Sequence, residues 1–280
     1  MLDEPNTPLV GPDWLAARLH LPGLVVLDAS VGAHRDAGRR IPGARRFDLD
    51  GALSDPASAL PHTMPAPAAF TEAVRALGVD DGSTVVLYDA AGIYSSPRAW
   101  WMLRAMGFDR AAVLDGGLPA WCGAGLPVEE RAPEAAAPVR GGFTARPRGG
   151  TVVGRAEVRA ALRDGAAVVL DARSAGRYAG TAPEPRPGLR GGHMPGAVNL
   201  PFGELLDGDG RMRSADALRA RFDERTAGAE RLVFSCGSGV TACVLALGAE
   251  LAGRGKAAAV YDGSWSDWGR PASGLPVVTG

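Results

Sequence analysis

The stretch LVFSCGSGVTACVLALGAEL, residues 232–251, decides the fold of its half of the chain. It begins with the continuous apolar run Leu232–Phe234, which is typical of a buried parallel strand. It ends with Val240–Leu251, rich in Ala and Leu, which predicts an apolar helix. A loop with two glycines separates the two segments. Alternation of a buried strand with a helix predicts an α/β domain with a mainly parallel sheet.

A second copy of this pattern occurs in the first half of the chain. The matching pairs are VVLDAS at 25–30 with VVLDAR at 168–173, IPGA at 41–44 with MPGA at 194–197, VVLYDA at 85–90 with LVFSCG at 232–237, and VLDGGLPAW at 113–121 with VYDGSWSDW at 260–268. Matches in one order across two halves indicate a duplicated domain of common size. We therefore expect one domain at residues 8–128 and another at 151–278.

Residues 129–150 read EERAPEAAAPVRGGFTARPRGG and have almost no large apolar side chains. A segment rich in Pro, Gly, Ala and charge is typical of a linker, and a Pro-rich linker tends to be extended. We expect this segment to connect the two domains and to run along both of them.

Bulk composition excludes several classes of protein. The 280 residues carry a net charge of -1, which does not favour a nucleic-acid or membrane-surface protein. The first residues include neither a basic nor an apolar leader, and no apolar run is long enough to span a bilayer. Three cysteines without a CxxC pair indicate no disulfide framework and no structural zinc, so we expect a cytoplasmic location.

Cys236 stands where the buried strand gives way to the helix. Glycines at 237 and 239 allow the backbone to curl with its amides pointing inward, and the helix directs its positive end to the same place. Both effects stabilise a thiolate, which favours a reactive cysteine. A lone cysteine after a strand is otherwise a small buried hydrophobe. We interpret Cys122, in an expected loop, and Cys243, on the helix, in that structural way.

Several motifs together resemble the two-domain rhodanese-type sulfurtransferases over nearly the whole chain. The catalytic-domain motifs are CGSGVTAC at 236–243, DARSAGRY at 171–178, GGHMPGAVN at 191–199 and YDGSWSDW at 261–268, and the motifs similar to the inactive N-terminal domain are residues 88–108 and LDGGLPAW at 114–121. The resemblance implies two tandem rhodanese-like domains, each a mainly parallel sheet flanked by helices. It makes Cys236 the sulfur carrier, and Asp89 at the matching position makes the first domain inactive. No metal or organic cofactor is implied, and we expect a monomer.

The residues after the cysteine bear on the sulfur donor. Thiosulfate-using rhodaneses usually place basic side chains there, whereas Gly237 and Ser238 are neutral. This resembles the mercaptopyruvate type, in which matching arginines, here Arg177 and Arg186, hold the donor. An arginine fork suits a carboxylate beside a carbonyl oxygen. The resemblance adds binding by the loop residues, which are Gly237, Gly239, Val240 and Thr241.

The resemblance also implies a Ser–His–Asp arrangement of Ser238, His62 and Asp50. In it, His62 orients Ser238 and accepts its proton, while Asp50 fixes His62. The expected reaction moves sulfur from 3-mercaptopyruvate through a Cys236 persulfide to a thiol such as thioredoxin, or to cyanide, and releases pyruvate.

Three alternatives stay open at this point. The first is a thiosulfate:cyanide sulfurtransferase on the same fold. The second is a non-enzymatic sulfur carrier or binding module. The third, a cysteine phosphatase, is disfavoured because its Cys-x5-Arg loop would need an arginine where Ala242 stands.

Overall fold

The computed structural model describes residues 7–131 and 138–280, which form two compact units. The first unit contains the described residues of Met1–Ala57 and Met64–Arg148, together with Gly208–Met212. The second unit contains Ser58–Thr63, Gly149–Asp207 and Arg213–Gly280.

The second unit is built on a five-stranded sheet in the order β10-β9-β11-β12-β8, with every pairing parallel. Its strands are β8 (Val152–Val153), β9 (Val168–Asp171), β10 (Val198–Asn199), β11 (Leu232–Ser235) and β12 (Ala258–Tyr261). Its helices are α5 (Arg155–Asp164), α6 (Ala175–Ala179), α7 (Ala215–Thr226), α8 (Ala242–Leu251) and α9 (Ser264–Trp268), with 3-10 turns at Phe202–Leu205, Gly255–Ala257 and Pro271–Ser273. The expected α/β architecture of this half is confirmed.

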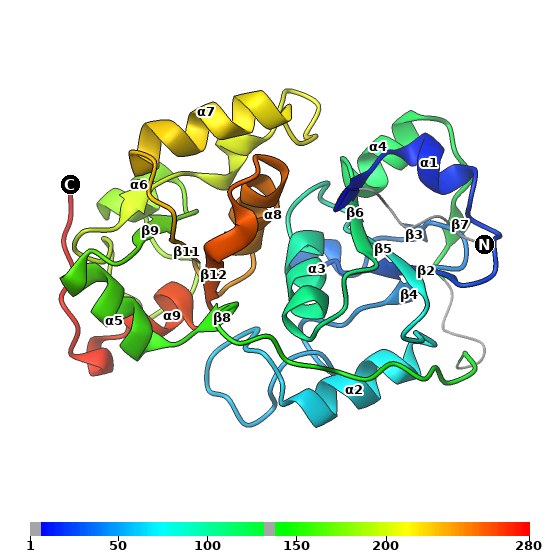
Figure 1. The fold of residues 1–280 in the computed structure, drawn as a ribbon, viewed down its shortest axis with the longest axis horizontal. Coiled ribbons are helices and arrows are strands. Elements are labelled where there is room, and N and C mark those ends of the chain that lie inside the picture. The colour runs from blue at the N-terminus through cyan, green and yellow to red at the C-terminus, as the bar shows by residue number, and fades with distance from the viewer. Residues whose placement is uncertain (1–6, 132–137) are drawn as a thin grey trace. The chain divides into compact units, whose positions relative to one another are not determined.

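Helices cover both faces of this sheet (Figure 1). Side chains of a strand alternate between its faces. Val169 and Val233 accordingly join the apolar cluster that contains Trp265 of α9. Phe234, next along β11, packs edge-to-face on Phe222 of α7, with ring centroids 6.3 Å apart. The central strand β11 is therefore buried on both sides, which explains its unbroken apolar sequence.

The first unit repeats this topology, in the order β1-β6-β5-β2-β4, again wholly parallel. Its strands are β1 (Leu9–Val10), β2 (Leu24–Asp28), β4 (Arg45–Arg46), β5 (Thr84–Tyr88) and β6 (Ala111–Leu114), and a separate antiparallel pair joins β3 (Arg39–Arg40) to β7 (Glu129–Glu130). Its helices are α1 (Pro12–Ala16), α2 (Pro67–Ala76), α3 (Ser96–Ala105) and α4 (Gly117–Gly123), with a 3-10 turn at Gly32–His34. The duplication inferred from the motifs is thus a duplication of strand order.

The predicted linker, 129–150, packs against the first unit over most of its described length: its described residues up to Arg148 belong to that unit, where Phe143 is fully buried and its amide donates to Val79 O. One aromatic side chain among small and charged residues is enough to anchor the segment in a core. Cys122 lies in helix α4, not in a loop, and packs partly buried against the core of that unit.

A short segment of each sequence half belongs to the other unit. Ser58–Thr63 precedes α2 yet belongs to the second unit, and Gly208–Met212 precedes α7 yet belongs to the first. In the first unit, Met212 N donates to Asp115 Oδ1 at 2.9 Å. This exchange places a residue from the first half of the sequence, His62, on the unit that contains Cys236.

Candidate active site

Cys236 directly follows the central strand β11, at the carboxyl edge of the parallel sheet of the second unit. In open α/β sheets this edge is where ligands bind. The residue is 2% exposed. Its amide donates to Ser264 Oγ at 3.1 Å, and the same oxygen accepts the amide of Gly239 at 3.1 Å. The serine hydroxyl therefore ties both ends of the turn Cys236–Gly239 to α9.

The carbonyl groups of this turn point toward α9. Cys236 O accepts the amide of Trp265 at 2.9 Å, and Gly237 O accepts the amide and hydroxyl of Ser266 at 2.9 and 2.7 Å. In a trans peptide the N–H is directed opposite to the C=O. The amides of Gly237 and Ser238 are therefore directed away from α9.

Several loop amides have no acceptor in the part of the chain that the structure describes. They belong to Gly237, Ser238, Val240, Thr241 and Ala242. Gly239 makes the curl possible with φ = +77°, a conformation that costs other residues strain. Buried amides without partners are unfavourable, so the loop is prepared to receive an anion.

The matching loop of the first unit shows where such amides point. There the side chain at the cysteine position, Asp89, accepts hydrogen bonds on Oδ2 from the amides of Tyr94, Ser95 and Ser96 at 3.0, 2.9 and 2.8 Å. Its Oδ1 accepts from Ala91 N at 3.1 Å. Since the two loops belong to copies of one domain, the free amides of the second loop are expected to surround the Cys236 sulfur.

Ser238 and His62 lie together, as the sequence predicted. His62 Nδ1 is 2.9 Å from Ser238 Oγ, across 176 positions of sequence. His62 has φ = +59°, which is uncommon for a residue with a side chain and indicates that its surroundings hold it. Arg270 supports the same segment by donating to Ala59 O at 2.6 Å. Asp50 belongs to the first unit, where its Oδ2 accepts from Gly32 N at 3.4 Å and lies 3.7 Å from Arg35 Nη1. Its part in the arrangement remains a prediction.

Arg177 of α6 reaches the cysteine loop. A Cβ atom at position 237 would lie only 2.9 Å from Arg177 Nη2, so the guanidinium needs the glycine there. Glu184 accepts Nε and Nη2 of this arginine at 3.2 and 2.6 Å. Arg186 is partly buried and has no hydrogen-bond or ion-pair partner within the described residues. None of its contacts connects it to the loop, so its role also remains a prediction.

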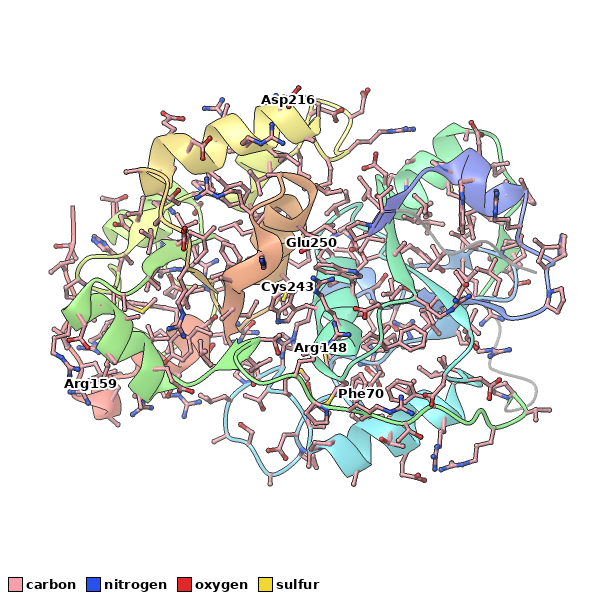
Figure 2. All side chains as sticks on the ribbon, viewed as in Figure 1. Phe70, Arg148, Arg159, Asp216, Cys243 and Glu250 are labelled. Atoms are coloured by element: carbon pink, nitrogen blue, oxygen red, sulfur yellow. The ribbon has the colours of Figure 1, made fainter. Side chains whose placement is uncertain are left out.

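Sequence reasoning missed Glu184, Arg173 and Ser264. Glu184 was visible as a carboxylate between two candidate arginines, and Arg173 follows Asp171 by two positions. Nothing in the sequence marked Ser264 as a loop support, because that role depends on its position next to Cys236 in space. Cys243, labelled on α8 in Figure 2, is buried and donates its thiol to Gly239 O at 3.2 Å, consistent with packing.

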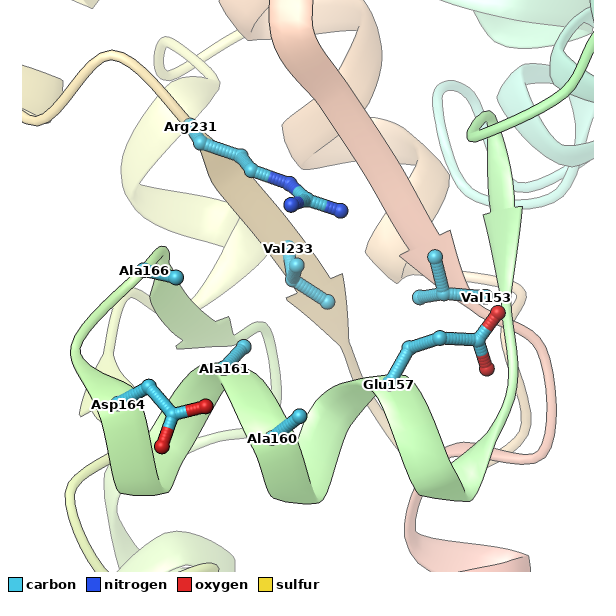
Figure 3. Close-up of a pocket in the computed structure, with 8 residues that line it drawn as sticks. All are labelled: Val153, Glu157, Ala160, Ala161, Asp164, Ala166, Arg231 and Val233. Atoms are coloured by element: carbon cyan, nitrogen blue, oxygen red, sulfur yellow. The ribbon is translucent and has the colours of Figure 1, made fainter.

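A small pocket lies elsewhere in the second unit, between α5 and strands β8 and β11 (Figure 3). Its volume is about 180 Å³. Five of its lining residues are alanine or valine, and the other three, Glu157, Asp164 and Arg231, are charged. Arg231 precedes the first residue of β11, whereas Cys236 follows the last. The pocket therefore lies between α5 and one face of the sheet, and Cys236 is not among the residues that line it. The described residues contain no cluster of three metal-ligating side chains, and none of their helices is long and apolar enough to cross a membrane.

The chain is similar to known proteins over nearly its whole length. The family model of the rhodanese-like domain matches residues 11–124 and 155–270. The 3-mercaptopyruvate sulfurtransferase of Escherichia coli K12 is 40% identical over 97% of this chain and 98% of its own. The mitochondrial thiosulfate/3-mercaptopyruvate sulfurtransferase 1 of Arabidopsis thaliana is 38% identical, over 94% of this chain and 76% of its own. The crystal structure of SseA from E. coli superposes with a TM-score of 0.80 at 37% identity, covering 93% of this chain and 99% of SseA.

Proposed function

This chain belongs to the family of rhodanese-like domain proteins, and we propose that it is a sulfurtransferase that takes sulfur from 3-mercaptopyruvate through a persulfide on Cys236. The observation that carries the proposal is the loop around Cys236, in which the amides of Gly237, Ser238 and residues 240–242 have no acceptor among the described residues, while Arg177 lies beside Gly237. Near-full-length similarity to enzymes named for this donor supports it.

In the first step, the Cys236 thiolate attacks the sulfur of the donor. An S–S bond forms and the C–S bond breaks, and its electron pair leaves with carbon as the enolate of pyruvate. One proton then converts the enolate into pyruvate, and the donor's thiol hydrogen stays on the outer sulfur until that sulfur ionises. The loop amides stabilise the negative outer sulfur of the persulfide in the way an oxyanion hole stabilises oxygen.

Arg177 and Arg186 would hold the donor. A guanidinium binds a carboxylate, or a carboxylate oxygen and the neighbouring ketone oxygen, through two parallel hydrogen bonds. The pair His62–Ser238, with 2.9 Å between Nδ1 and Oγ, would move the proton needed at the enolate. Asp50 would orient His62 in the complete arrangement.

In the second step, an acceptor thiolate attacks the outer sulfur and releases the Cys236 thiolate. A dithiol protein such as thioredoxin suits this step, and cyanide would give thiocyanate in an assay. We propose that the chain acts as a monomer, because one chain contains both domains and all the residues named above. We further propose a cytoplasmic location, since its three cysteines are free, which suits a reducing compartment.

Thiosulfate is the second candidate donor, since one similar enzyme is named for both donors and another, from Bos taurus, for thiosulfate alone. The neutral residues Gly237 and Ser238 favour mercaptopyruvate, because thiosulfate is a dianion and would be better served by cations beside the cysteine. Steady-state assays with both donors and cyanide as acceptor test the proposal. We expect the larger kcat/KM for mercaptopyruvate; a larger value for thiosulfate would assign the second candidate, and turnover of neither would reject both. A sulfur carrier would give a Cys236 persulfide by mass spectrometry without turnover.

A further inference from the structure

A buried chain of charges runs from β9 to Arg177. Arg173 is 1% exposed, and its Nε and Nη2 donate to the carboxylate of Asp171 at 3.0 and 2.6 Å. Its Nη1 donates to Glu184 Oε1 at 2.8 Å, and its Nη2 also donates to Gly192 O at 2.8 Å. The guanidinium carbon lies 4.2 Å from the centre of the Trp265 ring. Arg173 therefore cannot turn without losing several charge-assisted contacts.

Glu184 is the link between this fixed arginine and Arg177. Its side chain is 2% exposed, and Oε1 accepts from both arginines while Oε2 accepts Arg177 Nη2 at 2.6 Å. A carboxylate so deeply buried is stable only when paired and hydrogen-bonded. Asp171 fixes Arg173 from the other side, and this restricts the Glu184 carboxylate to one position.

The contact with Glu184 uses one particular edge of Arg177. Nε and Nη2 form that edge, and both donate to the glutamate. Nη1 has no acceptor in the described part of the chain, and Nη2, which uses one hydrogen on Glu184, has its second hydrogen on the side of Nη1 and lies beside Gly237. Because the guanidinium is planar and rigid, fixing its Nε–Nη2 edge also fixes the direction of the adjacent Nη1–Nη2 edge.

We propose that Glu184 is a positioning residue that turns the Nη1–Nη2 edge of Arg177 toward the donor carboxylate beside Cys236, with Arg173 as its anchor. This inference rests on the proposed function, in which Arg177 binds the donor. Without Glu184, the Arg177 side chain, which is 24% exposed, would sample many rotamers, and each bound donor would have to order it.

The competing explanation is structural: Glu184 could serve only to neutralise buried Arg173. Substitution Glu184→Gln separates the two roles. The amide keeps the shape and can still accept from Arg173, but it presents a donor to Arg177 Nη2. We expect the KM for mercaptopyruvate to rise about tenfold with kcat within about twofold, because one charge-assisted hydrogen bond of an orienting group is lost.

A double-mutant cycle with Arg177→Ala gives the sharper readout. If Glu184 acts through Arg177, Glu184→Gln should raise KM in the wild-type background but leave it unchanged when Arg177 is already alanine. An equal rise in both backgrounds would overturn the inference and leave the structural role. Discharge of a preformed Cys236 persulfide by cyanide should be unaffected by Glu184→Gln, since no carboxylate donor is bound in that step.

The matched control is Asp223→Asn, which removes another carboxylate of the second unit paired with an arginine, Arg254. It should leave KM unchanged. Should Glu184→Gln fail to fold, Glu184→Asp keeps the charge but shortens the reach, and it should show the same KM rise and the same dependence on Arg177. If the wild-type protein does not turn over mercaptopyruvate, the proposed function fails; if it does and KM ignores both Glu184 variants, only the positioning role fails.

Discussion

The loop after β5 and the loop after β11 hold the same place in two copies of one domain, yet different groups occupy them. In the first unit a carboxylate fills the loop: Asp89 is fully buried and accepts amides together with the hydroxyl of Ser96 at 2.7 Å. In the second unit a thiol stands at that position, and five of the loop amides, those of Gly237, Ser238 and residues 240–242, have no acceptor among the described residues. The comparison teaches that this loop of the repeated domain is suited to a negative charge. In the first copy the Asp89 carboxylate supplies that charge, and in the second copy we propose that the transferred sulfur does.

The first loop also shows the electrostatic cost of holding that charge. Burial raises the pKa of Asp89, while the hydrogen bonds from Ser96, Tyr94 and Ser95 act in the opposite direction. A buried charge is tolerated only where donors replace the lost water. The corresponding amides of the second loop would stabilise a persulfide anion on Cys236. Its outer sulfur would leave the loop at the end of each turnover.

We expect the largest effect from Cys236→Asp. This substitution gives the second loop the aspartate that the first loop has at the matching position, Asp89. Sulfur transfer should fall at least about a thousandfold, because the nucleophile is gone. The thermal melting temperature should not fall, since the first unit shows that this loop can hold a carboxylate. Cys122→Ser, in helix α4 of the first unit, is the control and should keep normal turnover. Sulfur transfer by the aspartate variant would remove Cys236 from the mechanism.

The next difference lies beside the cysteine, where Ser238 contacts His62 but the first loop has Ala91. His62→Ala should lower kcat for mercaptopyruvate about a hundredfold, a common loss for a proton-transfer group. Exposed His34 offers the matched variant, His34→Ala, which should leave kcat as it is. Stopped-flow measurement of pyruvate release would check the step, and an unchanged rate in His62→Ala would assign the histidine a packing role.

Asp89→Asn tests whether the loop of the first unit depends on its negatively charged carboxylate. The asparagine amide would place N–H donors against loop donors, so we expect a loss of about 2–3 kcal/mol in the free energy of unfolding. Sulfur transfer per folded molecule should stay within about twofold of normal, because Asp89 takes no part in the chemistry. Urea unfolding measures the loss, with the exposed Asp216→Asn as reference. Equal stability of the two variants would mean that the first loop does not depend on its carboxylate.

The smallest expected effect concerns acid sensitivity. Asp267 accepts the hydroxyl of Tyr261 at 2.6 Å and is paired with Arg155, whereas its match in the first unit is Ala120. Burial acts to raise the pKa of Asp267, but the hydrogen bonds from Arg155 and Tyr261 outweigh it and lower the pKa.

A lowered pKa in the folded state stabilises the fold above the ordinary aspartate value of about 4, and this stability is lost as the pH falls through the folded value. Asp267→Asn should therefore cost about 1 kcal/mol near neutral pH and progressively less in acid. Urea titrations measure the free energy of unfolding of the unsubstituted protein and of Asp267→Asn, at neutral pH and at the lowest pH at which both are folded. A difference that is the same at both pH values would show that the cost is not electrostatic.

Local pattern predicted much of the fold. The apolar run Leu232–Phe234 lies within β11, as predicted. The helix after Cys236 starts at Ala242, two residues later than the apolar pattern begins, because the loop amides are not used in helical hydrogen bonds. Helix ends are least visible in sequence where the backbone serves another purpose.

The sequence by itself determined the duplicated α/β domains, the place of Cys236 between strand and helix, and the neutral residues beside it. These features follow from neighbours along the chain, whose periodicity and conformational freedom act locally. Only the tertiary structure decided that Phe143 packs into the core of the first unit, that Ser264 supports the cysteine loop, and that Glu184 holds Arg177. Residues far apart in the sequence come into contact only when the helices and sheets pack together. No local sequence pattern specifies which of them will meet.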